Sequence, residues 1–451
     1  MNTPIYFDDA LPHFAAIVLQ AWGEKALLEN VFLRDADGRI TLVVLDSHST
    51  DIRESLGREV SEKLGVYVDG EFAVATPDEL FDDRLRDISC AKPVNLQHEV
   101  FFGKILLVDR RLVGADWLEE PKAPSTAPLR LVFASIKGGV GRSTALCVLA
   151  SHLASRGKRV LAVDLDLEAP GIGNMLLDAD TLPEFGLLDY LVEQHVGSVD
   201  DDFFADLVAS SWLGGGKGRV DVVPALGRRS LTNPANVLAK IARAYLINGA
   251  TNGDTSTGFA DHIETLLKQI AIPSSYDVVL IDARAGLHET TAAAVLGLGA
   301  EVLLFGIDQT QTIAGYEMLF AHLATLARHP QDDWRERLNF VHAKATLDKQ
   351  SQTGYAEAIQ GVAKKYLWPD ALQAAAPDLV ALQGEFETEW EEVYPLVEEI
   401  GPVKPIVILD AQRFQLFDPF RDRSTLEERV YLETFGEFLE KIDNIIGNET
   451  N

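Results

Sequence analysis

Short apolar runs, each followed by a polar or glycine-rich segment, recur along the chain from residue 129 onward. Segments with the spacing of helices, such as Thr144–Ser155, lie between them. Strands of a parallel sheet are buried on both faces and therefore read as continuous apolar runs, and helices connect them. The pattern predicts an α/β domain over residues 129–410, with a mostly parallel sheet flanked by helices. We expect its strands at Leu129–Ala134, Val160–Val163, Val220–Ala225, Tyr276–Asp282, Glu301–Ile307 and Leu338–Lys344.

Residues 1–118 mix strand-like and helix-like segments in a smaller module. Two strand-like runs flank the turn sequence Asp35–Gly38, which predicts a hairpin. A small α+β domain is therefore expected to precede the α/β domain, with the proline-rich residues 119–128 as the linker. Its elements are predicted at Val31–Arg34 and Ile40–Val44 (strands), Asp51–Leu64 (helix) and Ile105–Val108 (strand).

Two further regions stand out within the second half of the chain. Residues 195–270 are longer than a minimal α/β domain needs and contain two glycine-rich loops, Gly214–Gly218 and Asn248–Gly258. This elaboration either faces a partner or is a passive insertion. Residues 411–451 predict a helical tail whose apolar stripe consists of Tyr431, Phe435, Phe438, Ile442 and Ile445.

The other face of the tail is acidic, with Glu427, Glu428, Glu433, Glu437, Glu440 and Asp443. Helices that lie on anionic lipid need a basic polar face. We therefore expect this tail to dock on its own domain or on a protein partner, and we expect no stable membrane anchor.

A glycine-rich loop follows the first predicted strand of the α/β domain and opens a helix. Its sequence is Lys137-Gly138-Gly139-Val140-Gly141-Arg142-Ser143-Thr144. Glycines let successive backbone N–H groups turn inward, and the helix N-terminus adds positive potential, so the loop is typical of a phosphate-binding site. The hydroxyl of Ser143 is the expected Mg²⁺ ligand, while Arg142 or the loop amides would hold phosphate oxygens.

Carboxylates follow two other predicted strands. Asp164 and Asp166 stand at the end of one, in a sequence that continues to Pro170-Gly171, and Asp282 closes another. Ligands of open α/β sheets bind at the carboxyl ends of the strands, so all three aspartates are candidates for the same site. Arg284 and His288 come directly after Asp282, where they would either sense the ligand or act as a surface arginine and a helix-capping histidine.

These ordered motifs resemble those of the deviant Walker A ATPases, the ParA/MinD-type P-loop family of the SIMIBI class. The resemblance covers roughly residues 129–410 and implies a Mg²⁺-dependent ATP hydrolase that dimerises on ATP binding. It implies that Lys137 reaches the nucleotide of the partner subunit, and that a residue near the end of the strand Leu338–Lys344 reads the base, with His342 in that place.

The same resemblance assigns the aspartates. Asp164 and Asp166 would organise the water shell of the metal and the attacking water, and Asp282 would hold Mg²⁺ from the Walker B position. The chain departs from the usual P-loop at two positions, because Ile136 replaces the first glycine and Arg142 replaces the lysine before Ser143. An arginine fork is not equivalent to an ammonium, so the rate of hydrolysis does not follow from the sequence.

Composition limits the other classes of function. The 451-residue chain has a formal net charge of −29, which disfavours DNA as a partner, although a local basic patch around Lys217, Arg219, Arg228 and Arg229 leaves it open. No long apolar run or basic N-terminal leader is present, so a cytoplasmic protein is expected. The two cysteines, Cys90 and Cys147, form no C-x-x-C pair, which disfavours an iron–sulfur scaffold.

The sequence therefore favours an ATPase that acts as a nucleotide-controlled dimerisation switch and recruits or regulates a protein partner. Two alternatives remain open at this point. A nucleic-acid-associated partitioning or defence ATPase would show salt-sensitive retention on DNA, and an ATP-binding assembly scaffold would bind ATP tightly without releasing phosphate.

Overall fold

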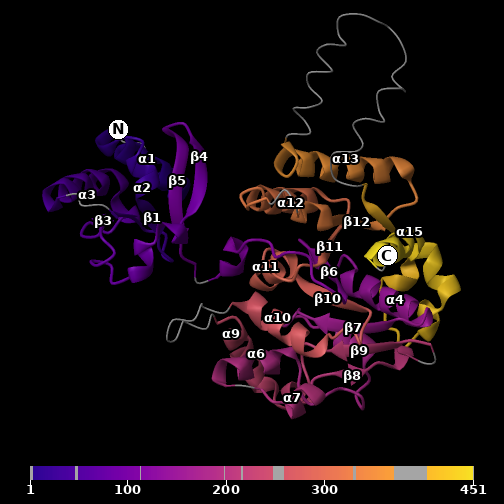
Figure 1. Cartoon of the computed structure of the whole chain (residues 1–451). Coiled ribbons are helices and arrows are strands. Elements are labelled where there is room, and N and C mark those ends of the chain that lie inside the picture. Colours follow the sequence, from indigo (N-terminus) through magenta and orange to yellow (C-terminus); the bar gives the residue numbers. More distant parts are fainter. Residues whose placement is uncertain are drawn as a thin grey trace, which may run out of the picture. The chain divides into compact units, whose positions relative to one another are not determined.

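The computed structural model describes residues 4–45, 49–111, 113–197, 199–214, 217–246, 258–328, 332–369 and 404–449. These residues form two compact units, Met1–Ala115 and Asp116–Asn451, which we describe separately (Figure 1). Among the described residues, no helix combines the length and the hydropathy that crossing a bilayer requires.

The first unit is a small α+β fold around a five-stranded sheet. The strand order is β3-β2-β1-β5-β4, in which β1 pairs parallel with β5 and antiparallel with β2. Apolar side chains of α1 and α3, such as Phe14 and Val60, are buried against this sheet. The elements are α1 (Phe7–Trp22), α2 (Ala26–Glu29), β1 (Val31–Arg34), β2 (Ile40–Val43), α3 (Thr50–Leu64), β3 (Val74–Ala75), β4 (Lys92–His98) and β5 (Phe101–Asp109).

The predicted hairpin is formed by β1 and β2, with Val31 opposite Val43. Gly38 closes its turn with φ of 89°, a left-handed conformation that favours glycine. The predicted helix corresponds to α3 and the predicted strand lies within β5. The sequence analysis did not predict α1 or β4.

The second unit contains an eight-stranded sheet with the order β13-β12-β11-β6-β10-β7-β9-β8. All neighbouring strands are parallel except β8 and β9, which confirms the predicted α/β fold with a mostly parallel sheet. The strands are β6 (Leu129–Ser135), β7 (Arg159–Asp164), β8 (Ala209–Ser210), β9 (Arg219–Val223), β10 (Val278–Ala285), β11 (Glu301–Gly306), β12 (Leu338–Ala345) and β13 (Ile406–Leu409).

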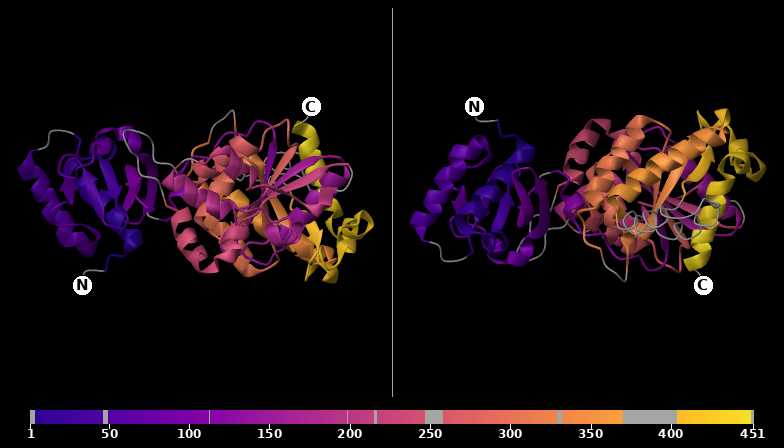
Figure 2. Two further views of the ribbon diagram at one scale, coloured as in Figure 1. Left: turned by 90° about the horizontal axis from the view of Figure 1, so that it is seen from below. Right: turned by 90° about the horizontal axis from the view of Figure 1, so that it is seen from above.

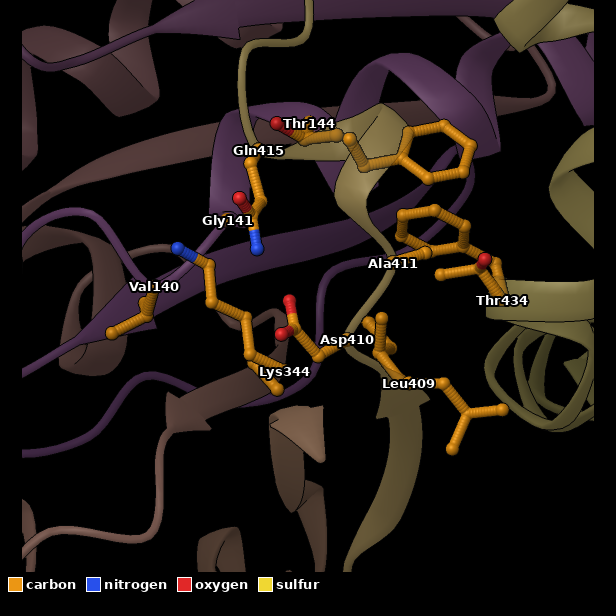
Figure 3. Close-up of a pocket in the computed structure, with 13 residues that line it drawn as sticks. Val140, Gly141, Thr144, Lys344, Leu409, Asp410, Ala411, Gln415 and Thr434 are labelled. Atoms are coloured by element: carbon orange, nitrogen blue, oxygen red, sulfur yellow. The ribbon is translucent and has the colours of Figure 1, made fainter. Parts of the chain in front are cut away.

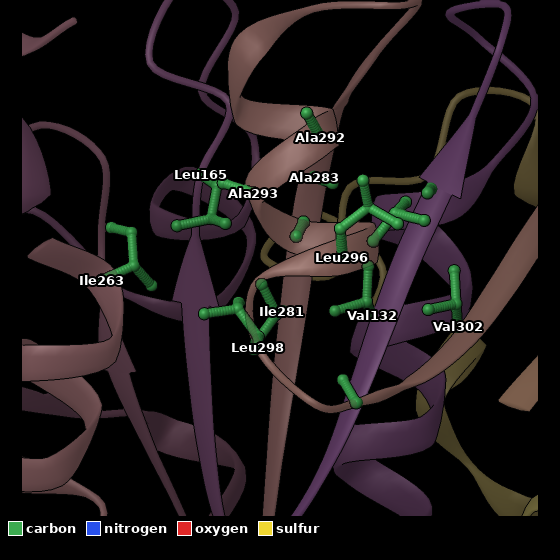
Figure 4. Close-up of a cluster of buried hydrophobic side chains, with 14 of the residues drawn as sticks. Val132, Leu165, Ile263, Ile281, Ala283, Ala292, Ala293, Leu296, Leu298 and Val302 are labelled. Atoms are coloured by element: carbon green, nitrogen blue, oxygen red, sulfur yellow. The ribbon is translucent and has the colours of Figure 1, made fainter. Parts of the chain in front are cut away.

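Helices cover both faces of this sheet, so its strands are apolar on both sides (Figure 2). One core joins the sheet to α6, α10, α11, α12 and α13, and part of it is drawn in Figure 4. The other joins the opposite face to α4, α5 and α15. The larger helices are α4 (Arg142–Ser155), α6 (Leu187–Val196), α9 (Val237–Ala244), α10 (Phe259–Ile270), α11 (Glu289–Leu296), α12 (Thr310–Leu323), α13 (Lys349–Tyr366) and α15 (Glu428–Glu449), and the shorter ones are α5 (Ile172–Leu176), α7 (Asp201–Ala205) and α8 (Arg228–Thr232).

The C-terminal helix α15 packs on its own domain, one of the two outcomes expected from its acidic outer face. Tyr431, Phe438 and Ile442 are buried in the core that also contains α4. At the edge of this contact, the buried His152 of α4 lies 3.0 Å from a carboxylate oxygen of Asp443. Burial lowers the pKa of His152, whereas the carboxylate of Asp443 raises it. Because burial has the larger effect, the pKa is below its usual value and the uncharged ring is favoured.

The predicted linker and the predicted elaboration both belong to the second unit. In the linker, the N–H groups of Lys122 and Ser125 donate to the carbonyls of Leu296 and Gly299, both at 2.8 Å. The elaboration contains β8, β9, α7, α8, α9 and all of α10. Residues 215–216 of the first predicted loop and 248–257 of the second lie outside the described residues.

Candidate nucleotide site

The glycine-rich loop connects β6 to α4, as the sequence analysis expected. Gly139 and Gly141 have φ values of 75° and 95°, which a side chain would strain, and α4 begins at Arg142. Ile136, at the position of the missing first glycine, packs on α12. A Cβ atom on Gly315 of that helix would lie 2.2 Å from Cγ2 of Ile136, so the glycine there makes room for the isoleucine. The loop therefore presents its amides at a helix N-terminus, where anions bind.

Ser143 and Asp282 meet behind this loop. The Ser143 hydroxyl donates to Oδ2 of Asp282, while Oδ1 of Asp282 is buried and has no hydrogen-bond partner among the described residues. Burial raises the pKa of Asp282 to about 6, against the opposing effects of Arg142 and the Ser143 hydroxyl. A hydroxyl and a carboxylate oxygen are ligands that Mg²⁺ accepts, so these residues fit the ion that the family implies.

Asp164 is in register with Asp282 on the neighbouring strand. Its Oδ1 accepts the N–H of Asp166 at 3.0 Å, and its Oδ2 accepts the N–H groups of Gly171 and Ile172 at 3.1 and 3.2 Å. Burial, followed by the charge of Asp282, raises the pKa of Asp164. Both carboxylate oxygens of Asp164 thus accept hydrogen bonds from backbone N–H groups of the segment that follows β7.

Asp166 accepts fewer hydrogen bonds from the backbone than Asp164 does. Its Oδ1 accepts the N–H of Ala169 at 3.2 Å, and its Oδ2 lies 3.6 Å from the guanidinium of Arg142. Burial raises its pKa, and the loop amide and Arg142 oppose this effect. Of the two aspartates at the end of β7 and just after it, Asp166 therefore has the carboxylate with more freedom to act on a ligand.

Arg142 is buried among these carboxylates. Its guanidinium donates to Oγ of Ser135 at 2.8 Å and lies 3.6 Å from oxygens of both Asp166 and Asp282. The sequence analysis offered Arg142 or the loop amides for the phosphate oxygens. In this structure the arginine balances the charge of the aspartates, which leaves the amides of Gly138–Ser143 as the donors of the loop.

Lys137, the first residue of the loop, is half-buried and donates from Nζ to the side-chain oxygen of Gln309 at 2.6 Å. Gln309 lies in the turn between β11 and α12. The two side chains tie the glycine-rich loop to the adjacent strand end.

His342 lies inside the fold. Its ring is stacked on Tyr355 of α13 with centroids 4.0 Å apart, and its Nδ1 has no hydrogen-bond partner among the described residues. Burial lowers the pKa of His342. A pocket beside the glycine-rich loop is instead lined by residues from the ends of β12 and β13, and His342 is not one of them (Figure 3). They include Lys344, whose Nζ donates to the carbonyl of Gly139 at 2.7 Å, and Asp410.

Arg284 lies near the end of β10, and His288 lies on the loop between β10 and α11. Arg284 forms an ion pair with Glu168, from the loop after β7, and Glu168 also accepts the hydroxyl of Tyr245 at 2.8 Å. His288 caps α11 through the N–H of Thr290 and contacts the Tyr245 ring edge-on. Burial lowers the pKa of His288. The histidine is thus a helix cap, and the arginine links the end of β10 to the loop after β7.

Asp410, Glu168 and Tyr245 were not identified from the sequence. Asp410 directly follows the apolar run Ile406–Leu409, a strand-end signal of the same kind as that of Asp282. Glu168 is adjacent to the Asp166 motif, but nothing in the sequence pairs it with Tyr245. Among the described residues, no group of three or more His, Cys, Asp or Glu side chains forms a protein-only metal centre.

Comparison with known proteins agrees with this geometry. Residues 131–365, more than half of the chain, match the family described as the CobQ/CobB/MinD/ParA nucleotide binding domain. The chain therefore belongs to this P-loop family. No curated protein matches it.

Several solved structures are similar over most of their length. They are the Cyanothece McdA–ATP complex (16% identity, 72% of this chain and 97% of that chain, TM-score 0.42), the septum site-determining protein MinD with Mg-ADP from Pyrococcus horikoshii OT3 (17%, 71% and 98%, 0.40), and a putative plasmid partition protein from Borrelia burgdorferi B31 bound to AMPPNP (15%, 69% and 97%, 0.40).

Proposed function

We propose that the chain is a Mg²⁺-dependent ATPase of the deviant Walker A type, in which ATP binding controls dimerisation and the recruitment of a protein partner. The observation that supports it most is the Ser143–Asp282 pair behind the glycine-rich loop, where a buried carboxylate oxygen has no hydrogen-bond partner among the described residues. A buried carboxylate left in this state is costly in the free protein, and a bound cation would offset that cost.

The roles of the side chains follow from their contacts. Ser143 and Asp282 would hold the ion, which supplies charge neutralisation to the phosphates. Asp164 is a positioning residue in this scheme, because both its oxygens hold the loop that carries Asp166. Asp166 is the proposed catalytic carboxylate that orients the attacking water. In the nucleotide-free protein, the positive charge of Arg142 offsets the repulsion between the carboxylates of Asp166 and Asp282.

The pocket beside the loop is the proposed base site. Asp410 lines this pocket, and a carboxylate there can accept a hydrogen bond from the exocyclic amino group of adenine. Lys344 would hold the loop through the Gly139 carbonyl. His342 would support this wall from inside the fold rather than contact the base.

Lys137 supplies the proposed link to the second subunit. Its ammonium is held by a neutral glutamine, and it is not ion-paired among the described residues. A charge-assisted bond to a phosphate is stronger than one to an amide, so a nucleotide bound by a partner subunit would attract Lys137 away from Gln309.

Calorimetric titration of ATP tests the assignment of the metal ligands. Ser143→Ala is expected to weaken Mg²⁺-dependent ATP binding by about tenfold or more, since it removes one ligand. Ser155→Ala, at the other end of the same helix, is the matched control and should bind as the wild type does. Equal affinity in all three proteins, or affinity that is unaffected by EDTA, would refute the proposal.

A further inference from the structure

One segment of this acidic chain contains no acidic residue. Between Asp221 and Asp254 there is neither Asp nor Glu, although the chain as a whole has a net charge of −29. The same segment contains four basic residues, Arg228, Arg229, Lys240 and Arg243. Its described part comprises α8 and α9 in the elaboration of the second unit.

The segment also exposes large apolar side chains. Leu231 on α8, Leu238 on α9 and Leu246 just after α9 are 54%, 78% and 54% exposed. Helix α9 already has another face on the domain, because Ile241 packs against the core and Ala244 is buried in it. The exposed leucines therefore do not contribute to the core of the domain. We call the residues Leu231, Leu238, Leu246, Arg228 and Arg243 the α8–α9 surface.

Among the residues that the structure describes, no carboxylate forms an ion pair with either arginine of this surface. Arg228 donates to the carbonyl of Leu182, and Arg243 donates to the carbonyl of Ala239, both at 2.8 Å. Neither forms an ion pair with the described residues, whereas Arg229 is paired with Glu184 and Lys240 with Asp189. Carbonyl contacts leave the positive charge available to a partner.

We infer that the α8–α9 surface binds an acidic amphipathic peptide segment of a partner protein, with apolar residues on the leucines and carboxylates on Arg228 and Arg243. Aliphatic contacts beside basic ones match such a segment better than they match a nucleic acid backbone. Charges beyond about 8–10 Å are screened at physiological salt, so a short peptide is exposed mainly to this patch. An extended anionic duplex or membrane would also face the acidic remainder of the domain.

This surface lies next to the candidate nucleotide site, because Tyr245 at the end of α9 donates to Glu168 of the loop after β7. The inference deepens the proposed function by naming the surface that a partner contacts. Its test needs no nucleotide, so failure to bind a peptide and failure to bind ATP are separate results.

The test is fluorescence anisotropy with the full chain and a labelled 18-residue synthetic peptide that carries leucine on one helical face and glutamate on the other. We expect saturable binding that weakens as salt increases. Leu238→Glu/Arg243→Glu should weaken it about tenfold or more, since it removes one apolar contact and reverses one charge. The control variant Val66→Glu/Arg58→Glu changes an arginine on α3 and an exposed valine in the turn just after it, and it should leave binding unchanged. Arg58 resembles Arg243, since its hydrogen bond within the described residues goes to a helix carbonyl, that of Glu54.

A second variant, Leu231→Ser/Arg228→Gln, guards against misfolding of α9 and should weaken binding in the same way. Absence of saturable binding by the wild type would overturn the inference, as would equal binding by the test and control variants. Tighter, variant-sensitive binding of duplex DNA or of phosphatidylglycerol vesicles would also overturn it, because the surface would then serve another class of ligand.

Discussion

At the scale of single residues, the site holds three aspartates, two of which, Asp166 and Asp282, lie 3.6 Å from the guanidinium of Arg142. Asp164, Asp166 and Asp282 all have raised pKa values, with burial as the largest cause. Groups of this kind are retained at functional sites at a cost in stability. The cost can be measured at Asp282, the only one of the three with a buried oxygen that has no hydrogen-bond partner among the described residues.

Asp282→Asn should stabilise the nucleotide-free protein at neutral pH. The pKa of Asp282 is about 6 in the folded chain and 3.8 ordinarily, so the unfolded chain loses this proton first as the pH rises. The loss of folding stability caused by ionised Asp282 therefore grows between about pH 4 and pH 6. Above this range it is constant, at about 2–3 kcal/mol. Urea unfolding in EDTA should therefore show a more stable variant at pH 8 and equal stabilities near pH 4.

Asp277→Asn is the control with the opposite sign. Hydrogen bonds from Arg159 lower the pKa of Asp277, so this variant should be less stable than the wild type at neutral pH and approach it as the pH falls. A pH-independent difference at Asp282, or a destabilised variant at pH 8, would contradict the electrostatic account.

At the scale of elements, Glu168 joins three segments that are far apart in the sequence. It bonds Arg284 near the end of β10 and Tyr245 at the end of α9, and it belongs itself to the loop that carries Asp166. A change in this loop or at the end of β10 on nucleotide binding would therefore reach the α8–α9 surface directly through Glu168 and Tyr245. Coupling between two sites requires a contact that differs between the nucleotide-free and the nucleotide-bound states. The contacts of Glu168 with Arg284 and Tyr245 are candidates for such a difference.

Tyr245→Phe should uncouple peptide binding from the nucleotide. The variant removes only the hydroxyl, so its peptide affinity without nucleotide should equal that of the wild type. Addition of a nonhydrolysable ATP analogue should shift the peptide affinity of the wild type by about fivefold and leave the variant unchanged. Tyr276→Phe, which removes a hydroxyl bonded to Asp221, is the control and should keep the shift. The same anisotropy assay decides, and an equal shift in the Tyr245 variant would exclude this path.

The sequence predicted the elements whose patterns are local. The glycine-rich loop, the strands that carry Asp164 and Asp282, and helix α15 follow from apolar periodicity and glycine placement. Strand β10 continues three residues beyond Asp282, where the predicted strand ended. The position of His342 does not, because its burial depends on Tyr355 from a helix that packs across the sheet. The orientation of Arg142 toward the aspartates likewise depends on three strands meeting at one edge, which no local pattern encodes.

At the scale of the whole molecule, the central claim is that ATP joins two copies of the chain through Lys137. In the structure, Lys137 donates to Gln309 of its own chain. The proposal requires Lys137 to exchange this hydrogen bond for one to a phosphate of the nucleotide bound by the other subunit. Electrostatic repulsion between two chains of charge −29 opposes association, so the proposal requires the contacts with the nucleotide to outweigh this repulsion.

The most direct test is the mass in solution, measured by light scattering with and without Mg²⁺ and a nonhydrolysable ATP analogue. The wild type should change from 49.4 kDa to twice this mass on addition of the nucleotide. Lys137→Ala should bind the analogue but remain at 49.4 kDa, while Lys349→Ala, which also removes a lysine bonded to a glutamine, should dimerise as the wild type does. A wild type that stays monomeric at saturating nucleotide, or a Lys137→Ala protein that dimerises equally well, would contradict the account.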